Sequence, residues 1–188
     1  MKIVKIIFLI LILASCKKTD NNGYRVYTIK EGKHRSTYAY HTSKDTTFNW
    51  NIIFDSSAIY STLDSLNQYD VNKLIGLSDC GTRHIENSIR FGWRWLDNSL
   101  QILWFKHENG EFTFGLIDSV SLCESHLYEL NIWSWNYGLC VDGNCVYIDR
   151  DCLEQRKRYM LYPYFGGQET APHDIKIKIK CAIVTGKP

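Results

Sequence analysis

The sequence predicts an all-β protein in which two antiparallel sheets pack as a sandwich. Aromatic residues make up 14% of the chain, and there are only three prolines. This composition favours strands over helices. Apolar and polar residues alternate in many segments, as they do in strands with one buried face. Short turn sequences such as Asn109-Gly110 separate these segments, and such spacing is typical of antiparallel sandwiches.

The strand-like segments follow one another along most of the chain. Asn109-Gly110 and Asp142-Gly143 have the residues that tight hairpin turns require, and Asp97-Asn98 separates two further strands. The expected strands are residues 24–30, 46–54, 85–96, 100–107, 111–120, 128–139, 146–150, 159–165 and 175–183.

One segment has a different pattern. Near residues 56–73, Ile59, Leu63 and Leu66 recur at helical spacing behind Asp55, which is suited to capping a helix. We therefore expect a short helix or an irregular crossing there. With no internal repeat and no composition shift, residues 24–188 are expected to form one domain, long enough to bury a core.

The amino terminus has the layout of an export signal. Lys2 and Lys5 precede an apolar run from Ile6 to Ala14, and small residues follow, which predicts a signal peptide over residues 1–15. Leu13-Ala14-Ser15-Cys16 resembles the bacterial lipobox, in which cleavage precedes a cysteine that carries lipid. The resemblance implies lipidation at Cys16 and anchoring to the membrane by acyl chains.

The residues around this signal refine the prediction. The apolar run is shorter than the roughly 20 residues that span a bilayer, and the polar residues 16–23 are expected to form a tether. The non-acidic Lys17 favours the outer membrane of the cell envelope. The alternative is a plain secretory signal, which would give a soluble protein with a terminal cysteine.

Composition excludes several function classes. The formal net charge is +2, so no general affinity for nucleic acid is expected. Gly-x-Ser-x-Gly, Walker, His-Glu-x-x-His and dinucleotide-binding motifs are all absent from the sequence. We expect no cofactor, and the oligomeric state is not predicted.

The cysteines fit an exported chain. Apart from Cys16 there are six, an even number that oxidation could pair. Cys140 and Cys145 flank the Asp142-Gly143 turn, where hairpin residues lie close enough for a disulfide. A metal site is the competing interpretation, but the spacing is not Cys-x-x-Cys and no histidine is near, so no metal is expected. The remaining four could pair or stay reduced; they are Cys80, Cys123, Cys152 and Cys181.

Alternation within the strands suggests a binding surface. Residues 85–95 place apolar side chains on one face and Arg90 and Arg94 on the other, while residues 128–136 place Glu129, Asn131, Trp133 and Trp135 on one side. Residues 159–165 place Leu161 and Phe165 together, with Tyr162 and Tyr164 on the opposite face. If the polar faces adjoin in one sheet, they suit a sugar chain; the alternative is an ordinary solvated face. The candidate ligand-binding residues are Arg90, Arg94, Trp133, Trp135, Tyr162 and Tyr164.

The carboxyl-terminal segments carry a family resemblance. Leu161 to Gly167, then Ala171 to Asp174 and a last alternating strand, resemble the concanavalin A-like jelly-roll group, which includes legume-type lectins, glucanases and alginate lyases. In the lyases an arginine neutralises the substrate carboxylate, while a tyrosine and a histidine move the proton. By that resemblance Arg90 would neutralise the carboxylate, His84 or His107 would be the base, and Tyr164 the proton donor.

The chain also departs from that group. It lacks the Gln-x-His motif of the lyases and the Glu-x-Asp-x-x-Glu motif of the glucanases. Three hypotheses follow. The first is a lipid-anchored, non-catalytic sandwich that binds a glycan or another surface ligand. The second is a divergent lyase or hydrolase acting on an acidic polysaccharide, and the third is a structural component of the envelope.

Overall fold

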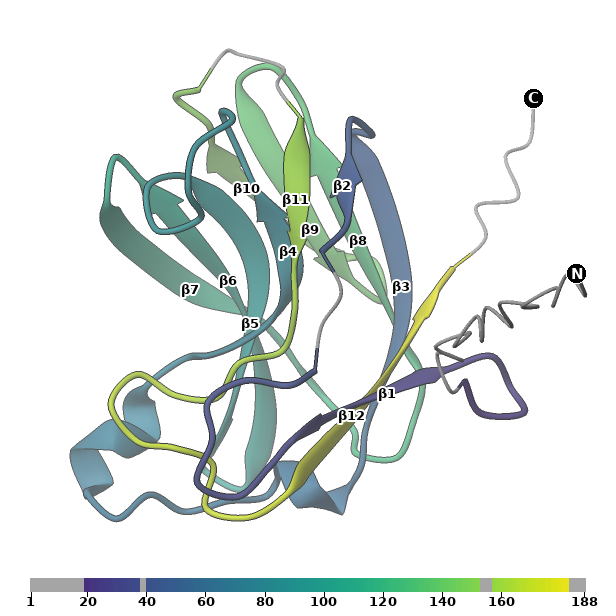
Figure 1. The fold of residues 1–188 in the computed structure, drawn as a ribbon, viewed down its shortest axis with the longest axis vertical. Helices are drawn as coiled ribbons and strands as arrows, with labels where there is room; N and C mark the ends of the chain where they lie inside the picture. Colours follow the sequence, from purple (N-terminus) through teal and green to yellow (C-terminus); the bar gives the residue numbers. More distant parts are fainter. Residues whose placement is uncertain (1–18, 38–39, 153–156, 183–188) are drawn as a thin grey trace, which may run out of the picture.

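The computed structural model describes residues 19–37, 40–152 and 157–182, which form two six-stranded antiparallel sheets (Figure 1). The predicted signal peptide, Cys16 and the first part of the expected tether lie outside the described residues, as does the end of the last expected strand. Within the described ranges, no helix is long and apolar enough to cross a membrane. The predicted fold class, a two-sheet antiparallel sandwich, is confirmed.

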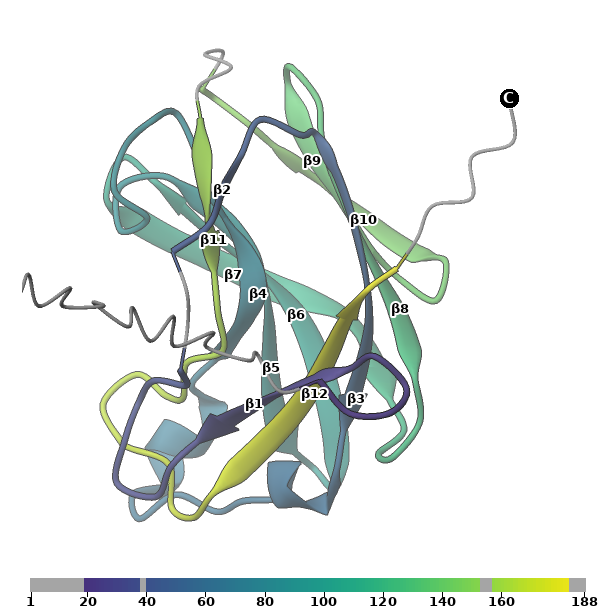
Figure 2. The ribbon, with the colours of Figure 1, turned by 45° about the vertical axis from the view of Figure 1, so that its right-hand side comes forward.

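Each sheet combines a run of consecutive strands with strands from distant parts of the chain. Sheet A has the order β1-β12-β3-β8-β9-β10, and sheet B the order β2-β11-β4-β5-β6-β7. In Figure 2, β8, β9 and β10 lie in the layer opposite β4, β6 and β7. The strands of sheet A are β1 (Arg25–Ile29), β3 (Thr47–Phe54), β8 (His126–Ile132), β9 (Asn136–Val141), β10 (Asn144–Asp149) and β12 (Ile175–Cys181). Those of sheet B are β2 (Thr42–Ser43), β4 (Asn72–Ser78), β5 (Ser88–Leu96), β6 (Ser99–Glu108), β7 (Glu111–Val120) and β11 (Arg158–Leu161).

The hairpin turns form where the sequence predicts them. Asp97-Asn98 connects β5 to β6, Asn109-Gly110 connects β6 to β7, and Asp142-Gly143 connects β9 to β10, all with positive φ. Positive φ at both central residues matches the right-handed twist of the flanking strands. The last turn pairs Cys140 with Cys145 directly across the hairpin, and the predicted disulfide between them is present.

The core lies between the inner faces of the two sheets. Ile89, Phe91 and Trp93 of β5 are fully buried, as the alternation predicts. Phe91 contacts Tyr128 of β8 edge to face, with ring centroids 5.1 Å apart. Trp93 lies 5.2 Å from the ring of Phe54 on β3. These contacts join the two sheets. The side chain of Arg90, which alternates with the buried residues of β5, lies on the opposite face of the strand.

Three expectations about the elements need correction. The short helix or irregular crossing expected near residues 56–73 is present as two 3₁₀ helices, η1 (Ser56–Ala58) and η2 (Ser65–Tyr69), but the strand β4 that follows them was not predicted. The pairing of β4 with β5 is irregular between Lys73 and Gly76, and this irregularity hides the strand's alternation. Residues 128–139 form two strands with a turn between them. Ile85 was expected in the core but precedes β5 in a turn and is 44% exposed.

Candidate functional site

The face of sheet B that points away from the core carries a groove. On β5, Arg90 and Gly92 alternate with the core residues and pair with Phe105 and Leu103 of β6. Two hollows lie on this face, with volumes of about 360 and 250 Å³. We call them together the sheet-B groove. The side chains used below are Arg35, Arg83, His84, Arg90, Tyr159 and Tyr164 in the larger hollow, and Lys73, Phe105, His107, Phe112 and Phe114 in the smaller one.

Arg90 is the central cation of the sheet-B groove, and it is buried. Its side chain donates from Nη2 to the carbonyl oxygen of Tyr162 at 2.8 Å and to that of Leu74 at 3.5 Å, while its Nε has no partner. Among the described residues no carboxylate pairs with it. Burial lowers the pKa of Arg90 to about 9, so the group is still a cation at neutral pH. Gly76 on β4 leaves room for it, because a Cβ there would collide with Arg90.

Two histidines lie near Arg90 and are linked to neighbouring hydroxyl groups. The backbone N–H of His84 donates to the Tyr159 hydroxyl at 2.7 Å, and His84 Nδ1 lies 3.0 Å from the same oxygen. His107 Nδ1 lies 3.3 Å from the Ser88 hydroxyl. Burial and the nearby Arg90, His84 and Lys73 lower the pKa of His107 to about 4. Burial and the surrounding arginines also lower the pKa of His84, so both histidines are neutral at neutral pH.

Other cations make the sheet-B groove electropositive. Lys73 donates to the carbonyl oxygen of Gly166 at 3.1 Å and lies 4.8 Å above the Phe105 ring. Burial and Arg90 lower its pKa to about 8. Arg35 and Arg83 line the larger hollow, and among the described residues that line the two hollows Asp70 is the one carboxylate. The groove therefore favours an anionic ligand.

Aromatic rings supply apolar surface beside these charges. Tyr164 stacks on His34 with ring centroids 5.1 Å apart. The rings of Phe105, Phe112 and Phe114 are nearly parallel, with Phe105 5.5 Å from Phe112 and 6.2 Å from Phe114. Phe112 is 57% and Phe114 43% exposed. Cations and exposed rings on one surface can hold a ligand that has both charged groups and apolar faces.

The structure brings together only part of the predicted site. Most of the predicted residues lie at the sheet-B groove: Arg90, His84, His107, Tyr162 and Tyr164. Arg94 lies farther along β5, where Nε donates to Gln101 Oε1 at 2.8 Å and Nη1 to the Tyr69 carbonyl oxygen at 2.9 Å. Those bonds tie β5 to β6 and η2.

The expected single surface that includes the tryptophans is not formed. Trp133 and Trp135 lie at the turn between β8 and β9 of sheet A, whereas Arg90 is on sheet B. The outward faces of two packed sheets point in opposite directions, so the polar faces of β5 and β8 do not adjoin. The alternation of each strand is readable from the sequence, but the sheet that each strand joins is not.

Tyr162 and Tyr164 both line the larger hollow, but the strand expected to carry both of them ends before either of them. Tyr162 stacks on Tyr27 of β1, 5.6 Å away, and packs against the core, whereas Tyr164 pairs with Lys73 of β4. Pro163, which lies between the two tyrosines, has no N–H for the ladder, and β11 ends at Leu161. The strict alternation assumed across residues 159–165 therefore breaks there.

Sequence reasoning missed several groove residues. Tyr159 lay within an expected strand, but nothing local marked it as the partner of His84. Lys73 belongs to the strand that was not predicted. Phe112 and Phe114 could have been found, because they alternate on one face of the expected strand 111–120.

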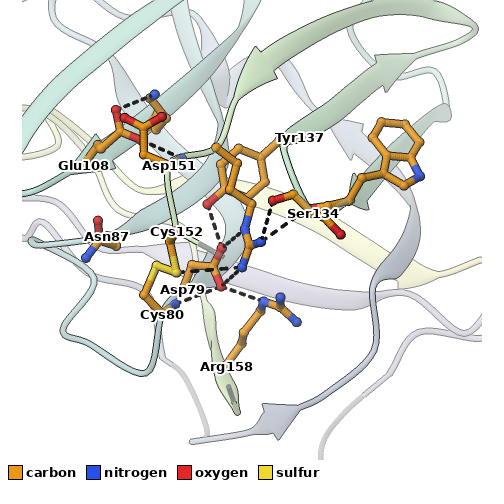
Figure 3. A network of polar contacts seen from close by, with 12 residues as sticks. Asp79, Cys80, Asn87, Glu108, Ser134, Tyr137, Asp151, Cys152 and Arg158 are labelled. Atoms are coloured by element: carbon orange, nitrogen blue, oxygen red, sulfur yellow. Dashed lines mark hydrogen bonds and ion pairs between the residues drawn. A yellow bond between two sulfur atoms is a disulfide. The ribbon is translucent and has the colours of Figure 1, made fainter. Parts of the chain in front are cut away.

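A buried charge network links the two sheets at one end of the sandwich (Figure 3). Asp79 accepts hydrogen bonds from Arg150 Nε at 2.6 Å, Arg158 Nε at 2.9 Å and the Tyr137 hydroxyl at 2.7 Å. The side chains of Asp79, Arg150 and Arg158 are at most 1% exposed. Burial alone would raise the pKa of Asp79, but the bonds from Arg150, Tyr137 and the Cys80 N–H hold it below its ordinary value. The carboxylate is therefore ionised.

A second disulfide closes this end of the molecule. Cys80 is bonded to Cys152, and Cys123 and Cys181 are free and exposed. Asp79 and the sulfur atoms of Cys80 and Cys152 lie within 4.8 Å of one another. The two sulfur atoms are bonded to each other and the carboxylate is paired with two arginines, so the cluster does not fit a metal ion.

Comparison with known proteins agrees with the fold. No family model and no curated protein sequence matches the chain. The alginate lyase AlyC3 aligns with a TM-score of 0.62 and 11% identity, over 91% of this chain and 78% of its own; a structure of AlyC3 in complex with dimannuronate aligns with a TM-score of 0.56 and 10% identity, over 85% of this chain and 73% of its own. SCLam, a non-specific endo-β-1,3(4)-glucanase of family GH16, aligns with a TM-score of 0.54 and 12% identity, over 84% of this chain and 69% of its own. The expected concanavalin A-like jelly roll is thereby confirmed as the fold of this chain.

Proposed function

We propose that the protein binds an anionic polysaccharide in the sheet-B groove without cleaving it. The observation that carries this proposal is the state of Arg90: the residue is 7% exposed, and its guanidinium has a free Nε and no carboxylate partner among the described residues. A buried charge is costly unless it is paired. A carboxylate or sulfate group of a bound sugar would supply the missing partner.

The rest of the sheet-B groove fits the same ligand. Arg35 and Arg83 add positive charge to the larger hollow and Lys73 to the smaller one. The exposed faces of Phe112 and Phe114 suit the apolar faces of sugar rings. The similarity in fold to an alginate lyase solved with dimannuronate supports a sugar ligand with carboxylates.

Binding of soluble alginate, measured by titration calorimetry on the full chain, tests the proposal. Arg90→Gln should weaken binding about tenfold, because it removes a charge-assisted contact. Arg94→Gln is the matched control and should leave affinity unchanged, since Arg94 bonds within the protein. Absence of binding to alginate and to a sulfated glycan would contradict the proposal and favour a structural role in the envelope.

A lyase is the second candidate function, and the contact between His84 and Tyr159 favours it. A neutral histidine can take the proton from the carbon beside the sugar carboxylate, whose charge Arg90 would neutralise. The electron pair then forms a carbon–carbon double bond while the glycosidic carbon–oxygen bond breaks. A tyrosine would donate the proton to the leaving oxygen. Tyr159, with its hydroxyl beside His84, joins Tyr164 as a candidate for that step.

Ultraviolet absorbance of the unsaturated product, during incubation with alginate and related polyuronates, separates binding from cleavage. A rise in absorbance that is lost in Arg90→Ala and in His84→Gln would establish the lyase and replace the non-catalytic proposal. Activity that survives Arg90→Ala would contradict the mechanism given above. No rise, together with binding, supports the non-catalytic function.

We further propose that the chain is anchored to the cell envelope through lipid on Cys16. The support is the Leu13-Ala14-Ser15-Cys16 sequence behind a short apolar run with two lysines. Expression in bacteria fed a labelled fatty acid should label the wild-type protein and not Cys16→Ser. Label on both proteins, or on neither, would contradict the proposal.

A further inference from the structure

Sheet A carries exposed aromatic side chains that the sheet-B groove does not use. Trp133 is 47%, Trp135 70% and Tyr147 65% exposed. The rings of Trp133 and Tyr147 lie side by side, with centroids 6.0 Å apart and planes 33° apart. Trp133 and Trp135 share one tight turn, closed by a bond from the Trp133 N–H to the Asn136 carbonyl oxygen. We call Trp133, Trp135 and Tyr147 the sheet-A platform.

The backbone beneath the platform is tied to the interior of the protein. Arg150 Nη1 donates to the carbonyl oxygens of Trp133 at 3.3 Å and Ser134 at 3.2 Å, and the backbone N–H of Arg150 donates to that of Trp135 at 2.9 Å. One buried residue therefore holds three consecutive carbonyl groups, and Asp79 holds its guanidinium in turn (Figure 3). A surface that is already ordered loses little entropy when it binds a ligand.

A glycine sets the orientation of the Trp133 ring. Gly138 of β9 points outward between the buried Tyr137 and Leu139, and the six-membered ring of Trp133 covers it. A Cβ at Gly138 would lie 2.6 Å from Cζ3 and 2.7 Å from Cη2 of Trp133. The indole thus rests on the strand, beside Tyr147, and nearly half of its surface stays open to solvent.

The charge around the platform distinguishes it from the sheet-B groove. None of the residues of β8, β9 and β10 is a lysine or an arginine. Glu129 and Asp149 instead add carboxylates to the outward face of this part of sheet A. An anionic chain would be repelled here. Flat rings with amides and carboxylates nearby suit the C–H faces and hydroxyl groups of uncharged sugars.

We propose that Trp133, Trp135 and Tyr147 form a second binding surface, on the sheet opposite the groove, for a neutral polysaccharide. This proposal is independent of the function assigned to the groove. A protein with both surfaces would hold neutral and anionic glycans at the same time. Such a protein would join two kinds of chain in the envelope or its surroundings.

Electrophoresis of the full chain in native gels that contain a neutral polysaccharide tests the proposal. The probes are mixed-linkage β-glucan, xylan and galactomannan, each in a separate gel. We expect retardation by at least one of them, weakened about tenfold in Trp133→Ala and in Tyr147→Ala. Trp133→Tyr keeps a ring and should retain most of the binding. Gly138→Ala should weaken binding without removing any aromatic side chain, because its Cβ displaces the indole.

Matched controls separate this surface from the groove and from misfolding. Arg90→Gln should leave retardation by the neutral probe unchanged, and every variant should keep the thermal midpoint of the wild type to within a few degrees. Failure of all three neutral glycans to retard the wild type would overturn the proposal, as would full retardation of Trp133→Ala/Tyr147→Ala. Loss of self-association in that double variant, seen by light scattering without any glycan effect, would identify the platform as an interface between copies and would also overturn it.

Discussion

Arginine is buried at two places in this sandwich, and the surroundings of the two places differ. At the end of the molecule, Arg150 and Arg158 share the carboxylate of Asp79. At the centre of sheet B, Arg90 is almost as buried, but its partners among the described residues are carbonyl oxygens. In the first place the fold supplies the counter-charge, so the arginines act as structural ties. In the second no carboxylate of the described residues supplies a counter-charge, and under the proposed function a bound anion would supply it.

The largest effect is expected from removing the shared carboxylate. Asp79→Asn should lower the free energy of unfolding by about 3–5 kcal/mol, because it leaves two buried guanidinium groups without their counter-charge. Urea denaturation measures the loss. Asp97→Asn, at an exposed turn with positive φ, is the matched control and should change stability by less than about 0.5 kcal/mol. A loss below about 1 kcal/mol for Asp79→Asn would show that the network is not a structural tie.

The disulfides provide the next test of which region holds the fold together. Cys80–Cys152 closes a loop with a sequence separation of 72, and Cys140–Cys145 one of 5. Loop-closure entropy predicts losses of about 4 and about 2 kcal/mol for the two double Cys→Ser variants. Urea denaturation of both should therefore show the larger loss at Cys80–Cys152, beside Asp79. Equal losses would contradict this ranking.

Replacing Arg90 with an apolar residue tests the other half of the comparison. Arg90→Met should leave the free energy of unfolding within about 1 kcal/mol of the wild type, since it removes a buried charge that no carboxylate of the described residues neutralises. Alginate binding should fall about tenfold in the same variant. Arg158→Met should do the opposite, with lower stability and unchanged binding. Destabilisation of Arg90→Met comparable to that of Asp79→Asn would mean that Arg90 is a structural tie after all.

Features set by residues close in the sequence were predicted correctly, whereas features set by contacts between distant segments were not. The period-2 pattern correctly placed Ile89, Phe91 and Trp93 in the core and Arg90 on the outer face, because one strand determines that pattern. Turn chemistry likewise predicted the Cys140–Cys145 bond. The sequence could not show that β5 and β8 lie in different sheets, since strand order depends on pairings such as β11 with β4 that join distant segments.

The same reasoning explains why the Asp79 network and Lys73 were not predicted. The Asp79 network draws its side chains from β9, the end of β10, β11 and the loop after β4, and no local pattern signals such a meeting. Lys73 lies where β4 pairs irregularly with β5, so its strand had no readable alternation. Both features arise from long-range contacts rather than from local propensity.

The smallest effects are expected from pH, and they have opposite signs for stability and for binding. Because burial and the nearby cations hold the pKa of His107 near 4 in the folded protein, below its ordinary 6.5, the unfolded chain binds more protons between these values. This contribution to stability is complete above about pH 6.5 and is lost as the pH falls towards 4. The loss of stability over that range, followed by urea denaturation, should be smaller in His107→Gln than in the wild type. An equal loss would contradict the assignment.

Binding of an anion in the sheet-B groove should weaken as the pH rises. Lys73, which faces Arg90, Asp70 and the Phe105 ring, has a pKa of about 8, so it loses its charge between pH 7 and 9. Alginate affinity should fall a few-fold over that interval, and Lys73→Arg, which keeps its charge, should flatten the decline. A bound carboxylate would also favour protonated His84 and His107, so binding near pH 6 should take up protons, as calorimetry in buffers of different ionisation enthalpy can measure. Affinity that is independent of pH from 6 to 9 would separate the binding site from the cations of sheet B, and Arg90 would then lose the role that distinguishes it from Arg150 and Arg158.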